Sequence, residues 1–321
     1  SFLRQPSLPR QKPDILEPLA TGDRGETWEN TCVDNICAMT LYSYQKYFRE
    51  GIQWRQIDER FYSSLCRVGY DFCVVDNLYQ VHMKSYPDAA NAMAFTFNGI
   101  DFLFKPHTVE FAANSQRQSI GTIRRTGAQV STNRAQYLAA FTDNFDIQFS
   151  YFPRMFKEDI IIKTKAGLPE ANVSQNRRDI TFDTVFSLDV AATTEIRVDN
   201  QVWDRQSQRI TTNPIHLKQG DTSFYLAQPI AYDARGMTIP LTYMLHTRDN
   251  ALYLTIKTPY DWLMNETRVY PITIDPTITL DYNSINWDGY LLYNTGIFCP
   301  EPPDPCNNPS RNGVTTYLPV G

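Results

Sequence analysis

The sequence lacks the runs of residues that mark several large classes of protein. No stretch approaches the roughly 18 to 20 consecutive apolar residues that a bilayer-spanning helix needs. An excess of basic residues is also missing, since 30 Lys and Arg stand against 35 Asp and Glu and the formal charge is −5. A chain of that charge has no general attraction for phosphate backbones or anionic lipid. We therefore expect no membrane insertion and no nucleic-acid partner.

The motifs that carry common catalytic chemistry are missing as well. The chain has no Gly-x-Ser-x-Gly elbow, no phosphate-binding Gly-x-x-x-x-Gly-Lys loop, no Gly-x-Gly-x-x-Gly turn and no His-Glu-x-x-His helix. The four histidines lie far apart in the sequence and form no ligand-spaced pair; they are His82, His107, His216 and His246. We interpret each as an ordinary surface or core histidine. We name no catalytic residue and expect a non-enzymatic protein without a metal or cofactor.

Neighbouring acids are the remaining candidates for catalysis. A glycosidase needs two carboxyl groups about 5 to 9 Å apart in a cleft. The available pairs are Asp58 with Glu59, Asp143 with Asp146, and Glu158 with Asp159. We interpret all three as solvated turns and strand ends. Asp143, Asn144 and Asp146 could also contribute to a calcium site, but the glycine turn and distal glutamate of a calcium loop are missing.

What the chain does contain is enough apolar residue to fold. Of its 321 residues 42% are hydrophobic, 13% aromatic and 20% charged, which excludes a wholly disordered chain. At about 150 residues per domain, the length favours two domains.

Six cysteines form three short-range pairs and indicate an oxidising compartment. The pairs are Cys32 with Cys37, Cys66 with Cys73, and Cys299 with Cys306. Local pairing is the simplest of the possible disulfide connectivities. A zinc site is the alternative, but its ligands favour shorter spacings than these. Asn172 and Asn265 begin Asn-x-Ser/Thr sequons, which suit surface glycosylation. We expect an extracellular or cell-surface protein with three disulfides.

Strand signals run through most of the chain. Asn98-Gly99 separates two apolar runs, as in a two-residue hairpin turn. A second turn is expected at Asp199-Asn200, between residues 194–198 and 201–203. Leu252, Leu254 and Ile256 alternate with polar residues at the period of a half-buried strand. Residues 41–48 could form a helix or an aromatic strand. The pattern predicts an all-β fold of two antiparallel sandwiches in tandem.

Changes in composition give the expected boundaries. Residues 1–28 carry spaced prolines and predict an extended arm. The first sandwich is expected at 29–166 and the second at 167–280, because Gly167-Leu168-Pro169 interrupts the strand pattern. Residues 281–321 form a proline-rich tail that the pair Cys299 and Cys306 would staple.

A short β-prone segment follows the staple. Its strand-forming residues are Val314, Thr315, Thr316, Tyr317, Leu318 and Val320. We expect this segment to add to a sheet edge of another subunit. The alternatives are that it pairs within its own chain or opens a further domain.

One stretch resembles a known group of proteins. Trp262-Leu263 followed by Tyr270-Pro271-Ile272-Thr273-Ile274-Asp275-Pro276-Thr277 is similar to the WL…YPvtIDPTi junction of large secreted proteins. These include proteins with DNRLRE-type repeats and Rhs-like exoproteins. Weaker likeness extends over about residues 45 to 280. The resemblance implies an exported, β-rich, non-catalytic scaffold and no catalytic residues.

These observations predict a structural protein of the cell surface, a homo-oligomer or filament assembled by exchange of arms and strands. The alternative is a carbohydrate-binding or adhesin module of a larger protein, and a virion appendage is a further one. The aromatic residues that could stack on a glycan are Tyr282, Trp287, Tyr290 and Tyr293.

Overall fold

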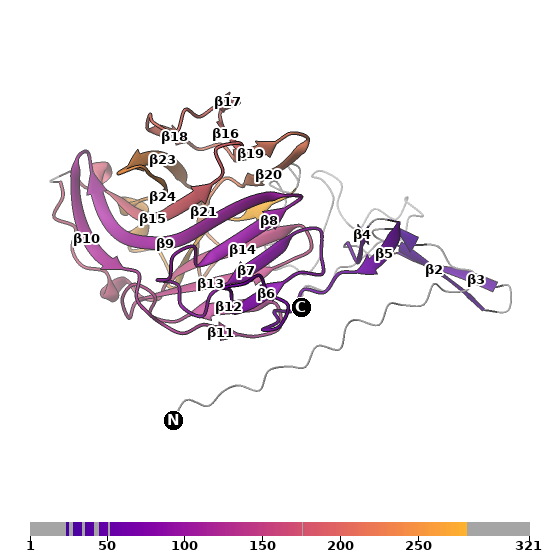
Figure 1. Ribbon diagram of the computed structural model, residues 1–321. Coiled ribbons are helices and arrows are strands. Elements are labelled where there is room, and N and C mark those ends of the chain that lie inside the picture. Colours follow the sequence, from indigo (N-terminus) through magenta and orange to yellow (C-terminus); the bar gives the residue numbers. More distant parts are fainter. Residues whose placement is uncertain are drawn as a thin grey trace, which may run out of the picture.

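The computed structural model describes residues 24–25, 28–33, 36–41, 45–50, 52–174 and 176–280. Strands make up nearly all of the regular structure in these residues (Figure 1). All paired strands are antiparallel, so the expected all-β, antiparallel fold class is confirmed. Most strands belong to two large sheets, here called sheet I and sheet II.

Sheet I has nine strands in the order β18-β23-β24-β15-β9-β8-β7-β6, with β10 also paired to β9. Its strands are β6 (Phe72–Val74), β7 (Gln80–Met83), β8 (Met93–Phe97), β9 (Ile100–Ala113), β10 (Gln116–Thr122), β15 (Thr181–Val190), β18 (Arg209–Thr211), β23 (Thr242–Arg248) and β24 (Ala251–Pro259). The long strand β9 and its partner β10 bend at one end of the molecule (Figure 1).

Sheet II has twelve strands, with the main path β11-β12-β13-β14-β26-β20-β19-β16-β17. The strands of this path are β11 (Gln129–Val130), β12 (Arg134–Tyr137), β13 (Phe145–Tyr151), β14 (Met155–Ile162), β16 (Glu195–Val198), β17 (Gln201–Val202), β19 (Ile215–Gln219), β20 (Thr222–Leu226) and β26 (Ile278–Thr279). Off the path, β25 (Ile272–Asp275) joins β14 to β21 (Ile230–Asp233), which pairs with β22 (Thr238–Pro240).

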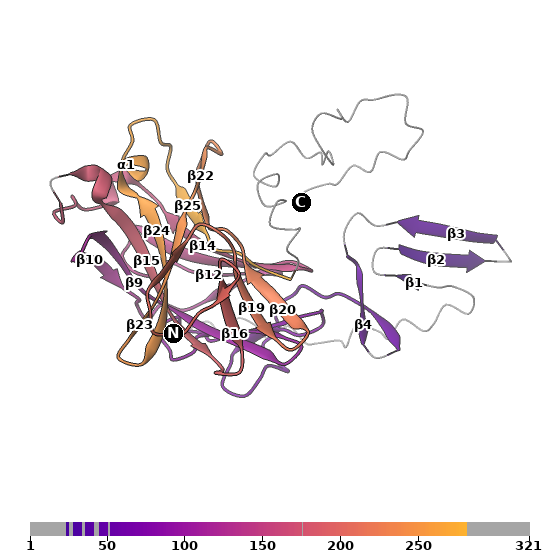
Figure 2. The same ribbon diagram turned by 90° about the horizontal axis from the view of Figure 1, so that it is seen from above.

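Two small sheets precede the sandwich. One contains β1 (Arg24–Gly25), β2 (Trp28–Val33) and β3 (Ile36–Leu41), and the other contains β4 (Tyr47–Glu50) and β5 (Gln53–Gln56). The described ends of the ambiguous stretch 41–48 are therefore strand. Helical structure in the described residues is limited to two 3-10 turns, Lys165–Gly167 and Arg177–Asp179, and the short helix α1 (Tyr260–Leu263). Figure 2 shows α1 at the end of the sandwich where β24 finishes.

The core lies between sheets I and II and is rich in aromatic rings. Phe182 of sheet I stacks on Phe145 of sheet II, with ring centroids 5.7 Å apart and the planes 2° from parallel. Phe95 of β8 also contacts Phe224 of β20 across the sheets, with ring centroids 4.9 Å apart and the planes tilted by 49°. Such contacts between facing sheets bury large apolar areas and hold the two layers together.

The expectation of two sandwiches in tandem is not confirmed. Strands from both sides of the expected boundary at 166/167 pair within each large sheet. In sheet I, β9 pairs with β15 over ten residues, from Thr181 to Val190. In sheet II, β14 pairs with β25 and β26. Gly167-Leu168-Pro169 therefore marks a crossover between sheets, because a chain interruption signals a connection and carries no information about which strands pair.

Local turn signals were more informative than the expected boundaries. The Asn98-Gly99 hairpin is confirmed: Phe97 pairs with Ile100, and both turn residues have positive φ angles of 44° and 87°. Asp199-Asn200 forms a second such turn between β16 and β17. Each turn depends only on its own residues, which explains why sequence reasoning located both.

Candidate functional site

The outer face of sheet I carries a regular array of side chains, in which a mostly buried and partly apolar middle row separates an aromatic from a charged one. Successive registers of β9, β15, β24 and β23 place them in three rows across the strands. We call this array the three-row face. The first row is Lys105, Ser187, Tyr253 and His246, the second is Thr108, Val185, Thr255 and Met244, and the third is Glu110, Asp183, Lys257 and Thr242.

Two residues of the first row, Tyr253 and His246, form a line of rings with the neighbouring His107, and we call these three residues the aromatic row. His246 stacks on Tyr253 with ring centroids 5.3 Å apart and planes 14° from parallel. His107, next to the first row on β9, lies 5.7 Å from Tyr253 on its other side, because the intervening strand β15 contributes only Ser187. Arg248 lies 5.2 Å from the centre of the Tyr253 ring. The result is a continuous line of rings from β9, β24 and β23 that extends over the intervening strand β15.

The third row consists of paired charges. Lys257 Nζ donates a hydrogen bond of 2.7 Å to Asp183 Oδ2, and Thr181 Oγ1 donates one of 2.6 Å to Asp183 Oδ1. Arg117 of β10 lies 3.2 Å from the Glu110 carboxylate. Asp183 is completely buried, whereas Glu110 and Lys257 are partly exposed. The row thus presents fixed donors and acceptors with little net charge.

Burial and neighbouring charges shift the pKa values of three ionisable groups on the three-row face. Burial lowers the pKa of His246, and Arg248 and Arg117 lower it further. Burial and then Lys105 lower the pKa of His107. Burial and then Asp183 raise the pKa of Glu110. Neutral imidazoles offer one donor and one acceptor nitrogen each, so the aromatic row can both donate and accept hydrogen bonds at neutral pH.

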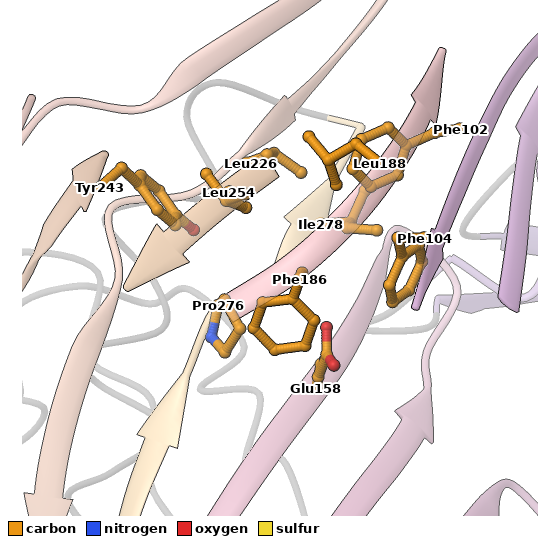
Figure 3. A pocket seen from close by; sticks show the side chains of 10 residues that line it. All are labelled: Phe102, Phe104, Glu158, Phe186, Leu188, Leu226, Tyr243, Leu254, Pro276 and Ile278. Atoms are coloured by element: carbon orange, nitrogen blue, oxygen red, sulfur yellow. The ribbon is translucent and has the colours of Figure 1, made fainter. Parts of the chain in front are cut away.

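A second unusual feature lies inside the sandwich. Glu158 of β14 points into the space between the sheets, where it lines a cavity of about 10 Å³ among apolar side chains (Figure 3). It is 5% exposed, and its Oε1 atom has no hydrogen-bond partner. Tyr243 lines the same cavity, and its hydroxyl also has no partner. Burial, followed by Asp159 and Asp275, raises the pKa of Glu158 well above its ordinary value.

The position of Glu158 and Asp159 corrects the interpretation of this pair as solvated. Both lie in the middle of β14, where they are 5% and 7% exposed. The alternation of the strand points them to opposite faces, so they do not form the paired acids of a glycosidase.

Asp146 is also buried, at 7% exposed, which corrects its interpretation as solvated. Asp58, Asp143 and Asp146 serve as local structural groups. Asp58 binds Arg60 through two hydrogen bonds of 2.9 and 2.7 Å. Asp143 bonds Arg124 at 2.8 Å, and Asp146 pairs with Lys163 at 2.8 Å. Among the described residues, no group of three or more His, Cys, Asp or Glu side chains is arranged to hold a metal ion.

The structure tests one of the three expected disulfides directly. Cys66 and Cys73 are bonded, with their Cα atoms 5.3 Å apart, which confirms that pair. The register of the β2–β3 hairpin places Cys32 opposite Cys37, and their bond stays a prediction. Cys299 and Cys306 lie outside the described residues.

Several other predicted sites can be placed. Asn172 and Asn265 are both exposed, as glycosylation requires. His82 accepts a hydrogen bond from the Arg67 backbone, and His216 stacks on Tyr225 with centroids 4.5 Å apart. The arm 1–28 falls almost entirely outside the described residues, and the tail aromatics and the strand Val314 to Val320 fall wholly outside them.

Sequence reasoning missed the three-row face. The period-two pattern of β24 did identify Tyr253, Thr255 and Lys257 as one side of a strand. The missing information was which strands lie beside β24, since β9 and β15 come from more than 60 residues earlier in the chain. His107 and His246 are distant in sequence, and only this pairing brings both of them against Tyr253.

Comparison with known proteins provides no further assignment. No protein-family model matches the chain, and no curated protein is significantly similar to it. The resemblance of residues 45 to 280 to secreted proteins with the WL…YPvtIDPTi junction stays a prediction. In the described part of the chain, no helix is long and apolar enough to cross a membrane.

Proposed function

We propose that the protein is an extracellular, non-enzymatic module of a surface or adhesive structure, and that its three-row face binds a glycan. The observation that carries this proposal is the aromatic row His107, Tyr253 and His246 beside the paired charges of Glu110, Asp183 and Lys257 on one sheet face. The Cys66–Cys73 disulfide supports the extracellular location.

A saccharide matches this surface chemically. Sugar rings present apolar C–H faces to aromatic rings and hydroxyl groups that donate and accept hydrogen bonds. The neutral histidines and the partly exposed Glu110 and Lys257 offer the matching donors and acceptors. Because these groups are held by pairing within the sheet, little conformational entropy is lost when a ligand binds.

The arrangement favours binding over hydrolysis. Glu110 and Asp183 are direct cross-strand partners, the spacing at which two acids could act together. Asp183, however, is fully buried, and its two oxygens accept hydrogen bonds from Thr181 and Lys257. An acid enclosed in this way cannot reach a glycosidic bond.

The test is a screen of the full-length protein on an array of neutral and acidic oligosaccharides, followed by titration calorimetry with each oligosaccharide that binds. We expect binding that Tyr253→Ala weakens at least about 10-fold. Tyr225→Ala is the matched control, because Tyr225 stacks on His216 outside the three-row face. An unchanged affinity of Tyr253→Ala, or a screen with no binding oligosaccharide, would refute the proposal.

Assembly into a filament remains a separate prediction. It rests on residues 1–28 and on the strand from Val314 to Val320. Electron microscopy of the native preparation tests it: filaments are expected, and particles of single subunits would contradict it.

A further inference from the structure

We propose that Lys157 and Asp275 form an intramolecular amide bond that joins strands β14 and β25. The starting observation is their position on the outer face of sheet II. Lys157 Nζ lies 2.6 Å from Asp275 Oδ2, and the two side chains are 13% and 1% exposed. A lysine and an acid so close and so well shielded from water can react with each other if their geometry permits it.

The approach of the two groups differs from that of an ordinary ion pair. Despite the short distance, Asp275 Oδ2 accepts no hydrogen bond, so Lys157 Nζ approaches it at an angle unsuited to hydrogen bonding. The second buried pair, Lys257 and Asp183, has nearly the same separation of 2.7 Å and does form a hydrogen bond. Two buried Lys–Asp pairs with nearly the same separation thus differ in whether they form a hydrogen bond. The orientation of Lys157 relative to Asp275 therefore needs an explanation other than distance.

Strand register explains the geometry. Ile160 pairs with Ile274, and Phe156 pairs with Ile278. Residues 157–159 of β14 therefore lie opposite residues 277–275, in reverse order. Asp159 therefore lies directly opposite Asp275, and Lys157 lies opposite Thr277 and diagonal to Asp275. All four side chains share the outer face, because alternate residues of a strand point to the same side.

Each neighbour has a distinct role in the reaction. Thr277 Oγ1 donates a hydrogen bond of 2.6 Å to Asp275 Oδ1, which holds the carboxyl group and stabilises the oxygen that becomes negative during addition. Asp159, across the strand pair, is the carboxyl group placed to accept and return a proton. Asp159 is 7% exposed and therefore acts in a site from which most water is excluded.

The chemistry balances without another reagent. A proton passes from the Lys157 ammonium to the Asp159 carboxylate and from there to Oδ2 of Asp275, which leaves a neutral amine and a carboxylic acid. Nζ then adds to Cγ of Asp275 and forms the C–N bond. The Cγ–Oδ2 bond breaks, and Oδ2 leaves as water with its own proton and one from the amine.

The bond would have a mechanical consequence. Pro276 has no backbone N–H to donate to β14, and the backbone pairing between β14 and the 272–279 segment is interrupted around it. A covalent bond at the neighbouring residue Asp275 would hold β14 and this segment together where the backbone pairing is interrupted. The inference does not depend on glycan binding, since the site lies on the other sheet.

Intact-mass spectrometry of the full-length protein, denatured and fully reduced, tests the proposal. We expect a mass about 18 Da below the value calculated from the sequence, which corresponds to the loss of one water. Lys157→Arg should restore the full mass, because arginine keeps the charge but does not form the amide. Lys257→Arg, the matched control, should retain the loss.

Peptide mapping of the unmodified protein locates the bond independently of how the variants fold. A branched peptide that joins the segments around Lys157 and Asp275 would support the proposal. The full calculated mass in the wild-type protein would overturn it. A loss of about 18 Da that persists in Lys157→Arg would also overturn it, since dehydration would then lie elsewhere.

Discussion

Glu158 lies opposite Pro276 in the pairing of β14 with the segment that follows β25, and both side chains line the same cavity between the sheets (Figure 3). The acid is thus buried in the core at a point where its partner strand offers no backbone N–H. A carboxyl group without a hydrogen-bond partner in such a place is costly when ionised.

Ionisation of Glu158 should therefore lower the stability of the protein as the pH rises above the ordinary glutamate pKa. Burial raises the pKa of Glu158 in the folded state, so the folded protein holds the proton more tightly than the unfolded chain does. The stabilisation that comes from this proton is complete below the ordinary glutamate pKa, about 4.3, and is lost as the pH rises from there to the raised pKa. Glu158→Gln should increase the free energy of unfolding at pH 8 by about 1 kcal/mol or more.

Urea denaturation of both proteins from pH 5 to pH 8 measures this effect. The difference between them should grow with pH. Glu266→Gln, at a fully exposed glutamate paired with Lys165, provides the control and should show no such growth. A difference between Glu158→Gln and wild type that does not change with pH would contradict the assignment.

A tight contact at Gly167 leads to a second prediction. A Cβ atom on Gly167 would lie 2.3 Å from Cγ of Asn144. The Asn144 side chain cannot move away easily, because it accepts hydrogen bonds from Thr164 N and Oγ1 and donates one to Thr164 O. Gly167→Ala should destabilise the protein by about 1–3 kcal/mol in denaturant unfolding.

Gly127→Ala is the matched control, since nothing lies within 4 Å of a Cβ atom built at Gly127. This substitution should be neutral or slightly stabilising. Equal effects of the two substitutions would show that the contact with Asn144 does not constrain this turn.

The continuity of the sandwich can be tested through Phe182. Its ring stacks on Phe145, which lies on the other side of the expected domain boundary. Phe182→Ala should cost about 3–5 kcal/mol. Because both sheets take strands from both halves of the chain, calorimetry of the sandwich should show one cooperative transition that shifts as a whole. Two transitions, with only one affected, would instead indicate separate domains.

The Cys66–Cys73 bond should stabilise the edge of sheet I. It closes a loop of sequence separation 7 next to β6. In the chain-entropy model, a disulfide that closes a loop of this size increases the free energy of unfolding by about 2 kcal/mol. Replacing both cysteines by alanine should lower the melting temperature measured by circular dichroism, whereas an unchanged melting temperature would show that the loop is held by other contacts. These other contacts include two hydrogen bonds of 2.8 Å between the backbones of Tyr62 and Cys73.

Sequence reasoning succeeded where a few neighbouring residues determine the structure. The turns at Asn98-Gly99 and Asp199-Asn200 depend on residues that tolerate positive φ angles, and the Cys66–Cys73 bond closes a short loop. The alternation in β24 likewise identified Leu254 and Ile256 as core residues, and both are buried.

Sequence reasoning failed where pairing between strands distant in the chain determines the structure. The order β24-β15-β9 in sheet I brings together strands distant in the chain, and no local pattern specifies that order. The same limit hid the meeting of His107 with Tyr253. The interpretation of Glu158 was wrong for a different reason. Burying a charged group is usually costly, so an acid is expected in solvent even when its neighbours in the strand are apolar.

The central claim is that the three-row face binds a glycan, and the most direct measurement is parallel titration calorimetry of wild type, Tyr253→Ala and Tyr225→Ala. The ligand is the oligosaccharide that binds most tightly on the array. The account predicts that Tyr253→Ala weakens binding at least about 10-fold, which corresponds to about 1.4 kcal/mol, while Tyr225→Ala matches wild type. Equal affinity of Tyr253→Ala and wild type would show that the glycan binds elsewhere and would contradict the account.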